Sequence, residues 1–335
     1  MIRPSRFAIL LFWLSVSLTA VATQPDTIPF RPSGKPIITI YSNFHTEFTP
    51  GGTGRTGFAL TRVYLGYRYD LHPHFTTVVK LDIGSPDDLG ITSKLRRYAY
   101  FKNAYVEYHA QGFQWQFGLV GTQMFKLSEK YWGHRYIAKA FMDAQRFGPS
   151  ADLGMILSYR FAGGFKVDFS MLNGEGYTRL QVDSTFKYAA GITWQASERW
   201  VIRGYADLYP HTFTRSVVSL FAGYRSDHLT AGWEVDRYFN AGHTRGEDKW
   251  GVSASLSWQM TEKFQYFLRI DHLNTGIRGE TGTWDERSPG TGLITGLQFS
   301  PVDKIALALT WRTWTPTVIQ RRSSHWLFLN LLVKI

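Results

Sequence analysis

Cysteine is absent from this chain of 335 residues, and charged residues make up only 19% of it. Without a thiol, the chain has no disulfide, cysteine-ligated zinc, iron–sulfur cluster or thiol nucleophile, which excludes several large enzyme classes. Its mean hydropathy of −0.20 is too polar for a bundle of membrane-spanning helices. Aromatic residues are abundant instead, with 24 Phe, 18 Tyr and 12 Trp beside 31 Gly. This composition favours β-structure.

The first 22 residues have the features of a secretory signal peptide. Two arginines form a short basic region, an apolar run follows from Phe7 to Val16, and Ala20-Val21-Ala22 is a small-residue cleavage site. The alternative is a transmembrane anchor, but this run is shorter than the ~20 apolar residues of a membrane span. We expect residues 1–22 to be removed and residues 23–36 to form a periplasmic lead-in, so that the mature protein leaves the cytoplasm.

The rest of the chain alternates between apolar and polar residues, with turn residues between the alternating segments. In the segment TRVYLGYRYD from Thr61, Val63, Leu65, Tyr67 and Tyr69 fall on one face and mostly polar residues on the other. The segments FQWQFGLVG and WGVSASLSWQ follow the same pattern. One face of each segment suits lipid and the other suits water.

A soluble β-sandwich would also alternate, so three further features distinguish a membrane barrel. Aromatic residues stand at the ends of the apolar faces, as in Trp250 with Trp258 and Phe186 with Trp194, where the interfacial girdles of a transmembrane barrel lie. The opposite faces are rich in Gly, Ser, Gln and charged residues, as a water-filled lumen allows. Short connections also alternate with long ones, which is typical of bacterial outer-membrane barrels. We therefore predict an all-β, transmembrane antiparallel barrel.

Segmentation on the alternation predicts sixteen strands, and a merged or divided hairpin would make fourteen or eighteen. The predicted strands are residues 37–48, 58–70, 75–83, 98–109, 113–121, 151–161, 164–172, 185–195, 199–208, 216–225, 228–238, 249–259, 263–272, 291–300, 304–314 and 325–335. The barrel then covers residues 37–335, and Thr122–Ser150 is the third and longest of the long loops. An even strand number places both termini on the short-turn, periplasmic side. Barrels of sixteen to eighteen strands leave an aqueous channel.

The stretch from Asn103 to Tyr177 resembles the phosphate-selective porin O and P family. The motifs that carry the resemblance are NAYVEY from Asn103, a following strand that contains Phe-Gly, a long loop with Glu129, Trp132, Gly133 and Arg135, then SADLG from Ser150 and LNGEGY from Leu172. They cover about a quarter of the chain, and the remaining barrel pattern is compatible with the family. The resemblance implies a sixteen-stranded, homotrimeric porin whose third extracellular loop folds into the lumen.

The C-terminus departs from the usual pattern of outer-membrane barrels. Such proteins generally end in an aromatic residue that the barrel assembly machinery reads, whereas this chain ends in Ile335. Alternate residues from Leu327 to Ile335 are still apolar, so the last strand is still predicted. The departure concerns how the assembly machinery recognises the chain.

Motifs for chemistry are scarce. Residues Gly52 to Gly57 match G-x-G-x-x-G, but a dinucleotide site requires a helix after this motif and here another strand follows. His72 and His74 flank a proline in a predicted turn, and two imidazoles do not make a closed metal site. We expect no cofactor and no metal.

An outer-membrane barrel enzyme that acts on lipid is the alternative function. Ser323 and Ser324 beside His325 supply a candidate nucleophile and base. Neighbours in an alternating strand point to opposite faces, however, and a third orienting group is needed. We therefore predict no enzyme activity. A closed structural or docking barrel is the other alternative.

The formal net charge of +11 does not indicate nucleic-acid binding, because the basic residues are spread over the strands of an exported protein. Eleven basic strand residues are predicted to face the lumen: Arg62, Arg68, Lys80, Arg160, Lys166, Lys187, Arg203, Arg225, Arg269, Arg312 and Lys334. Ten acidic residues oppose them: Glu47, Asp70, Asp82, Glu107, Asp152, Asp168, Asp207, Glu234, Asp236 and Asp271. The wall is nearly neutral, and we expect many of these charges to form cross-strand ion pairs.

The third loop has a clear basic excess, with Lys126, Lys130, Arg135, Lys139 and Arg146 against Glu129 and Asp143. A short helix is expected within residues 128–143, with Ser128 as its N-cap. If the loop folds inward, its charges lie at the narrowest point, where Lys or Arg favours anions. Lys126, Lys130, Arg135 and Lys139 are the predicted selectivity residues, Arg135 foremost because guanidinium binds oxyanions bidentately. The predicted function is passive diffusion of small anionic or neutral solutes through a porin surrounded by outer-membrane lipid, with a mild anion preference in which phosphate is one candidate.

Overall fold

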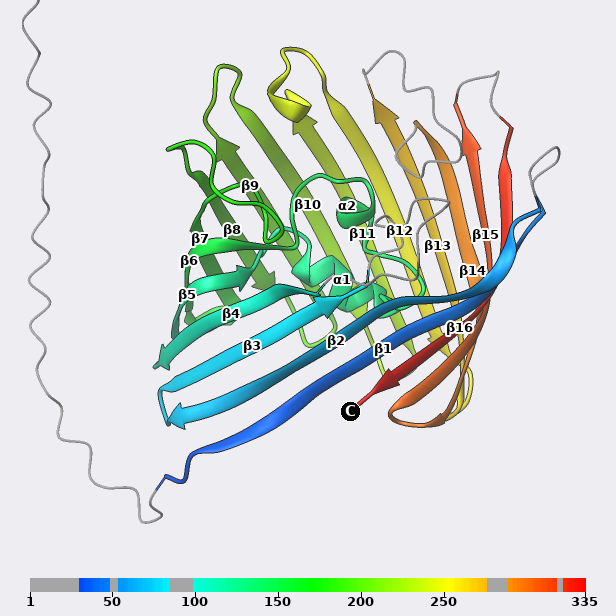
Figure 1. The fold of residues 1–335 in the computed structure, drawn as a ribbon, viewed down its shortest axis with the longest axis horizontal. Coiled ribbons are helices and arrows are strands. Elements are labelled where there is room, and N and C mark those ends of the chain that lie inside the picture. Colours follow the sequence, from blue (N-terminus) through cyan, green and yellow to red (C-terminus); the bar gives the residue numbers. More distant parts are fainter. Residues whose placement is uncertain (1–29, 49–53, 85–98, 276–288, 318–321) are drawn as a thin grey trace, which may run out of the picture. The chain divides into compact units, whose positions relative to one another are not determined.

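The computed structural model describes residues 30–48, 54–84, 99–275, 289–317 and 322–335. The predicted signal peptide and most of the predicted lead-in lie outside these residues. Pro32–Ile335 forms one compact unit, and its sixteen strands close into an antiparallel barrel (Figure 1).

The strands follow one another around the barrel in chain order, and β1 pairs with β16 to close it. Their bounds are β1 Ser33–Glu47, β2 Thr56–His72, β3 Phe75–Ile83, β4 Ala99–Ala110, β5 Phe113–Gly121, β6 Ala151–Arg160, β7 Phe165–Leu172, β8 Lys187–Gln195, β9 Trp200–Tyr209, β10 Arg215–Arg225, β11 Leu229–Phe239, β12 Lys249–Gln259, β13 Phe264–Thr275, β14 Gly290–Val302, β15 Ile305–Pro316 and β16 Ser324–Lys334. All sixteen predicted strands are confirmed, most within two residues at each end.

The largest error in the predicted bounds is at the start of the barrel. Strand β1 begins at Ser33, so the strand includes Pro36 and the predicted lead-in is too long. Proline normally ends or avoids a strand because it has no N–H to donate. Here the part of β1 around Pro36 pairs with β2, where Pro36 lies opposite Tyr67, while the β1–β16 register begins at Thr39. Since the β1–β16 register does not reach Pro36, the missing N–H of this proline removes no hydrogen bond from that ladder.

The two ends of the barrel have different connections, as predicted. Seven connections, from β2–β3 to β14–β15, contain only two to four residues. Residues 122–150 form a long connection between β5 and β6. The register pairs Thr39 near the start of β1 with Lys334 at the end of β16, and Ser33 with Asp70 beside a short turn. Both ends of the barrel chain therefore lie on the short-turn side.

The outer surface is a belt of apolar side chains. Leu220, Val235 and Leu309 lie near the middle of their strands and are 54–57% exposed. Aromatic residues gather towards the strand ends, and the rings of Phe165 and Trp194 stack with centroids 5.6 Å apart. Trp250 and Trp258 at the two ends of β12 are both exposed. This exterior differs from the surface of a soluble protein, which rarely exposes so large an apolar patch.

The third long loop lies within the ring of strands (Figure 1) and contains two short helices, α1 (Lys126–Trp132) and α2 (Phe141–Ala144). The expected helix is thus present, but the predicted N-cap is wrong. Phe125 is the N-cap residue, and Ser128 lies inside α1, where its hydroxyl donates to the carbonyl of Phe125 at 3.2 Å. Neither helix is long and apolar enough to cross a membrane, and the described residues contain no other helix that is.

Candidate functional site

The third loop packs against one part of the lumen wall, β8–β15, which we call the covered wall. Phe141 and Phe147 of the loop are fully buried with Tyr205, Tyr238 and other residues of this wall. A second cluster joins Trp132 and Ile137 to strands β13–β15. Glycine allows one of the closest approaches, since a Cβ at Gly223 would lie 2.6 Å from the ring of Tyr131. Burial of these aromatic rings fixes the loop to the wall.

Three arginines of the covered wall also hold the loop by its backbone. Arg203 donates to the carbonyl of Gln123 at 3.2 Å and Arg269 to that of Lys139 at 2.7 Å. Arg225 donates to the carbonyl of Lys130 at 3.3 Å. All three were predicted to face the lumen. Their guanidinium groups bind the loop, so they do not present their whole donor set to a solute.

Carboxylates of the covered wall are withdrawn from the lumen. Glu234 and Asp236 on β11 are buried, with the residues at 6% and 1% exposure. Asp271 accepts from Arg269 at 2.7 Å and from the hydroxyl of Ser253 at 2.7 Å. The loop therefore covers acidic side chains that the near-neutral wall count had placed in the lumen.

A cavity of about 600 Å³ remains on the other side of the loop. Strands β1–β5 and β16 form its wall, which we call the open wall. The basic residues that line the cavity are Lys80, Lys102, Lys126, Lys130, Arg135 and Lys334. Among the described residues that line it, Glu129 is the sole carboxylate. The cavity is therefore strongly basic, through wall and loop together rather than through the loop alone.

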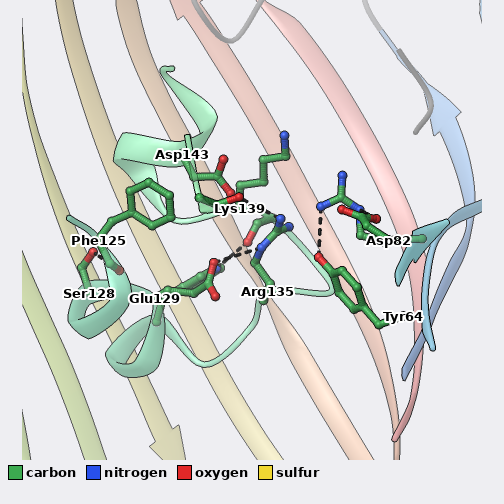
Figure 2. A network of polar contacts seen from close by, with 12 residues as sticks. Tyr64, Asp82, Phe125, Ser128, Glu129, Arg135, Lys139 and Asp143 are labelled. Carbon is green, nitrogen blue, oxygen red and sulfur yellow. Dashed lines mark hydrogen bonds and ion pairs between the residues drawn. The ribbon is translucent and has the colours of Figure 1, made fainter. Parts of the chain in front are cut away.

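Arg135 is fixed by two carboxylates of its own loop (Figure 2). Its Nε lies 3.0 Å from Glu129 and its Nη2 lies 3.3 Å from Asp143. Burial disfavours its charge, but Tyr64, Asp143 and Glu129 together raise the pKa of Arg135 above its usual range. The guanidinium stays charged, and two of its three nitrogens contact carboxylates of the loop. Arg135 lines the cavity as predicted, but two carboxylates share its charge, so its role as the foremost oxyanion ligand stays a prediction.

The other three predicted loop residues divide into two kinds. Lys126 and Lys130 line the cavity, and both have solvent-accessible side chains. Protein atoms around the cavity displace part of the water from the Lys126 ammonium, which lowers its pKa. Lys139 is not among the residues that line the cavity, and its carbonyl accepts from Arg269. Of the four predicted residues, Lys126, Lys130 and Arg135 line the cavity, and Arg135 is the one whose charge is paired with carboxylates.

The three predicted basic residues of β2 and β3 also differ from one another. Arg62 lies 3.2 Å from Asp82 and donates to the Tyr64 hydroxyl at 3.1 Å. Arg68 pairs with Asp70 at 3.3 Å and does not line the cavity. Lys80 does line it, with its Nζ 5.2 Å from the centre of the Tyr64 ring.

Lys102 is a cavity residue that the alternation did not find. Strand β4 has a register shift opposite Lys80 and Leu81, which pair with Asn103 and Phe101 and leave Lys102 as the extra residue. A bulge of this kind turns two consecutive side chains to one face. Lys102 and Asn103 therefore both line the cavity, while Phe101 is 57% exposed. The sequence signal for this bulge is that strict alternation would turn the charged Lys102 towards lipid and Phe101 towards the lumen.

Predicted ion pairs within the wall are present. Lys187 lies 2.6 Å from Asp207 across β8 and β9. Arg203 binds Asp168 bidentately at 2.7 and 2.9 Å, reaching from β9 to β7 across β8. Gly191 on the strand between them leaves the space, because a Cβ there would lie 2.3 Å from the guanidinium. Together these pairs connect β7, β8 and β9.

The candidate enzyme residues do not come together as a catalytic group. Ser324 is buried, and the hydroxyl of Ser323 lies 3.3 Å from that of Thr315. The His325 ring stacks on Trp311, with centroids 6.0 Å apart. Part of the Gly52–Gly57 motif lies outside the described residues. Within the described residues, no group of three or more His, Asp or Glu is arranged to hold a metal ion.

No protein-family model and no curated protein matches this sequence. Solved structures match its fold over most of the chain. The outer membrane channel DcaP of Acinetobacter baumannii matches with a TM-score of 0.66 and 13% identity, covering 91% of this chain and 97% of that one. The anion-selective porin from Comamonas acidovorans matches with a TM-score of 0.67 and 10% identity over 91% and 100%. Salmonella typhi OmpF, in complex with daunomycin, matches with a TM-score of 0.66 and 7% identity, covering 90% of this chain and 97% of that one. At these identities the likeness establishes the fold.

Proposed function

We propose that this protein is an outer-membrane porin through which small hydrophilic solutes diffuse passively, with a mild preference for anions. The observation that carries the proposal is the basic cavity between the third loop and the open wall, inside a barrel with an apolar exterior. A ring of basic groups at a constriction favours anions. The fold shared with an outer membrane channel and an anion-selective porin supports the same reading.

The cellular setting is part of the proposal. The signal peptide would direct residues 23–335 out of the cytoplasm, and the barrel assembly machinery would insert the barrel with both termini in the periplasm. The resemblance of residues 103–177 to phosphate-selective porins supports membership in that family and assembly as a homotrimer. Phosphate is then one candidate solute among small anions.

Planar bilayers test the function directly. We expect the purified, refolded barrel to conduct, and its reversal potential under a KCl gradient to have the sign of chloride preference. No conductance from folded protein would contradict the porin, and a cation preference would contradict the anion part alone. Lipid hydrolysis abolished by Ser323→Ala or Ser324→Ala would instead favour the enzyme alternative, and a folded barrel with neither activity would favour the closed structural one.

Two double variants locate the selectivity within the loop. Lys126→Gln with Lys130→Gln removes the charges that line the cavity, so we expect the chloride preference to fall. Arg135→Gln with Lys139→Gln removes the same formal charge from positions that are ion-paired or outside the lining. We expect this second double variant to lower the chloride preference less than the first. If it lowers the preference more, the selectivity filter lies at Arg135.

A further inference from the structure

Lys102 differs from the ion-paired basic groups of the lumen wall. Arg62, Lys187, Arg203 and Arg269 each have a carboxylate within 3.2 Å. For Lys102, no carboxylate of the described residues lies within ion-pair distance of the ammonium. Its Nζ instead donates to the hydroxyl of Ser150 and lies 4.0 Å from the centre of the Tyr177 ring.

The surroundings of Lys102 call for an anion. The residue is only 7% exposed, and it lines the cavity. Asp143 and Asp82 attract the ammonium only from beyond ion-pair distance, and a buried charge without an ion-pair partner is costly. Lysine has three donors, of which Ser150 accepts one and the face of Tyr177 receives another. The Tyr177 hydroxyl is held at 2.9 Å by Asp82, which fixes its ring beneath the ammonium. The third N–H has no recorded partner among the described residues and is available to a ligand in the cavity.

Part of the cavity lining, beside its basic residues, is aromatic and aliphatic and suits a ligand with an apolar, planar body. Tyr41, Tyr64 and Tyr136 line it as one aromatic cluster, with ring centroids 5.9 Å apart for Tyr41 and Tyr64 and 6.4 Å for Tyr41 and Tyr136. Ile37 and Leu332 add aliphatic surface. A volume of about 600 Å³ is in the range of small-molecule sites. A bare inorganic anion would not use the aromatic and aliphatic surface that these residues present to the cavity.

We propose that Lys102 is the centre of a binding site for a small organic carboxylate that carries a planar ring. The carboxylate binds the ammonium of Lys102 beside the Ser150 hydroxyl, and the ring lies among the cavity tyrosines. The site deepens the proposed porin function, on which its role in permeation rests, by naming the solute class. The bulge in β4 is the feature that places the ammonium there.

Direct binding tests the site without relying on conduction. Titration calorimetry on the folded barrel in detergent would use benzoate, its neutral counterpart benzamide, and acetate. We expect benzoate to bind more tightly than either of the other two. Lys102→Gln should weaken benzoate by roughly tenfold or more, the usual effect of losing a charge-assisted hydrogen bond. Lys102→Arg should retain part of the binding, and Lys304→Gln, on an exposed turn, should leave it unchanged.

The tyrosines are tested separately. Tyr41→Leu should reduce the preference for benzoate over acetate while leaving acetate binding as it was. Equal affinities of the wild-type protein for benzoate and benzamide would overturn the proposal without any variant. Unchanged benzoate binding by a folded Lys102→Gln barrel, checked by heat-modifiable gel migration, would also overturn it.

Conductance separates this proposal from the porin function. Benzoate should block the chloride current of single channels in the wild type, and Lys102→Gln should relieve the block. A barrel that binds benzoate but never conducts would keep the site and reject the porin. A barrel that conducts chloride but binds no benzoate would keep the porin and reject the site.

Discussion

The covered wall and the open wall carry similar types of charged residue, but the contacts of these residues differ between the two walls. On the covered wall, the charged side chains bind other groups of the protein. Lys187 and Arg203 pair with wall carboxylates. Arg225 and Arg269 donate hydrogen bonds to loop carbonyls. On the open wall, Lys80 and Lys102 face a cavity lined by a single described carboxylate. A nearly neutral wall therefore becomes a basic cavity because the loop covers one side of it. Charge in a barrel lumen depends on what is covered as much as on what is present.

The largest expected effect comes from releasing the loop from the covered wall. Phe141 is fully buried between the loop and the wall, and truncation of such a ring costs roughly 3–5 kcal/mol. Phe141→Ala should therefore give frequent openings to a higher conductance level and rapid protease cleavage within residues 122–150. The control is Phe101→Ala, which removes the same atoms from the outer surface. Equal behaviour of the two variants would show that Phe141 does not hold the loop.

A similar loss of stability is expected from breaking the ion pair between β7 and β9. Arg203→Ala leaves Asp168 buried without its bidentate partner, which typically costs about 3–5 kcal/mol. The temperature at which the folded gel band converts to the unfolded one should fall markedly. Arg237→Ala removes a pair with Asp248 whose arginine is 46% exposed, and such surface pairs contribute about 0–1 kcal/mol. If Arg237→Ala lowers the temperature as much, burial is not what makes the Arg203 pair strong.

Alternation predicted the architecture because a lipid-facing and a water-facing side repeat every second residue in all sixteen strands. The same rule failed at Lys102, where one extra residue in β4 reverses the facing of the side chains before it. It also could not show that the charge of Arg135 is paired, because the ion pairs with Glu129 and Asp143 depend on how the loop folds back on itself. Periodicity thus gives strands and faces, whereas bulges and loop packing decide which charges meet a solute.

Low pH should weaken the packing of the third loop against the covered wall, because His134 of the loop takes up a proton. This loop imidazole is fully buried, with Nδ1 2.7 Å from the carbonyl of Trp132 and Nε2 3.0 Å from Gln265, and burial lowers its pKa to about 4. In a displaced loop its pKa returns to about 6.5, so the displaced state binds more protons between these values. The free energy that favours the packed loop over the displaced loop is fully present above about pH 6.5. It decreases by up to about 3 kcal/mol as the pH falls to about 4.

The measurement is the frequency of high-conductance openings at about pH 7.5 and about pH 4.5. The wild type should open more often in acid, and His134→Gln should remove this part of the pH dependence because glutamine keeps hydrogen-bonding capacity without the titration. An identical increase in both proteins would assign the effect to other titrating groups of the loop and wall.

The smallest expected effect compares single charges on the two walls. Lys80→Gln removes a charge that lines the cavity, whereas Glu234→Gln replaces a carboxyl group that is buried on the covered wall. Charges beyond about 8–10 Å are screened at physiological salt, and one nearby charge in water contributes about 1 kcal/mol, or about fivefold in local ion concentration. The reversal potential under a KCl gradient should therefore shift towards zero in Lys80→Gln. The chloride-to-potassium permeability ratio should fall by at most about fivefold. Glu234→Gln should leave the ratio close to the wild-type value, because the covering loop separates that carboxylate from the permeating ions. A shift of the same size in both variants would mean that the covered wall still faces the conducting path.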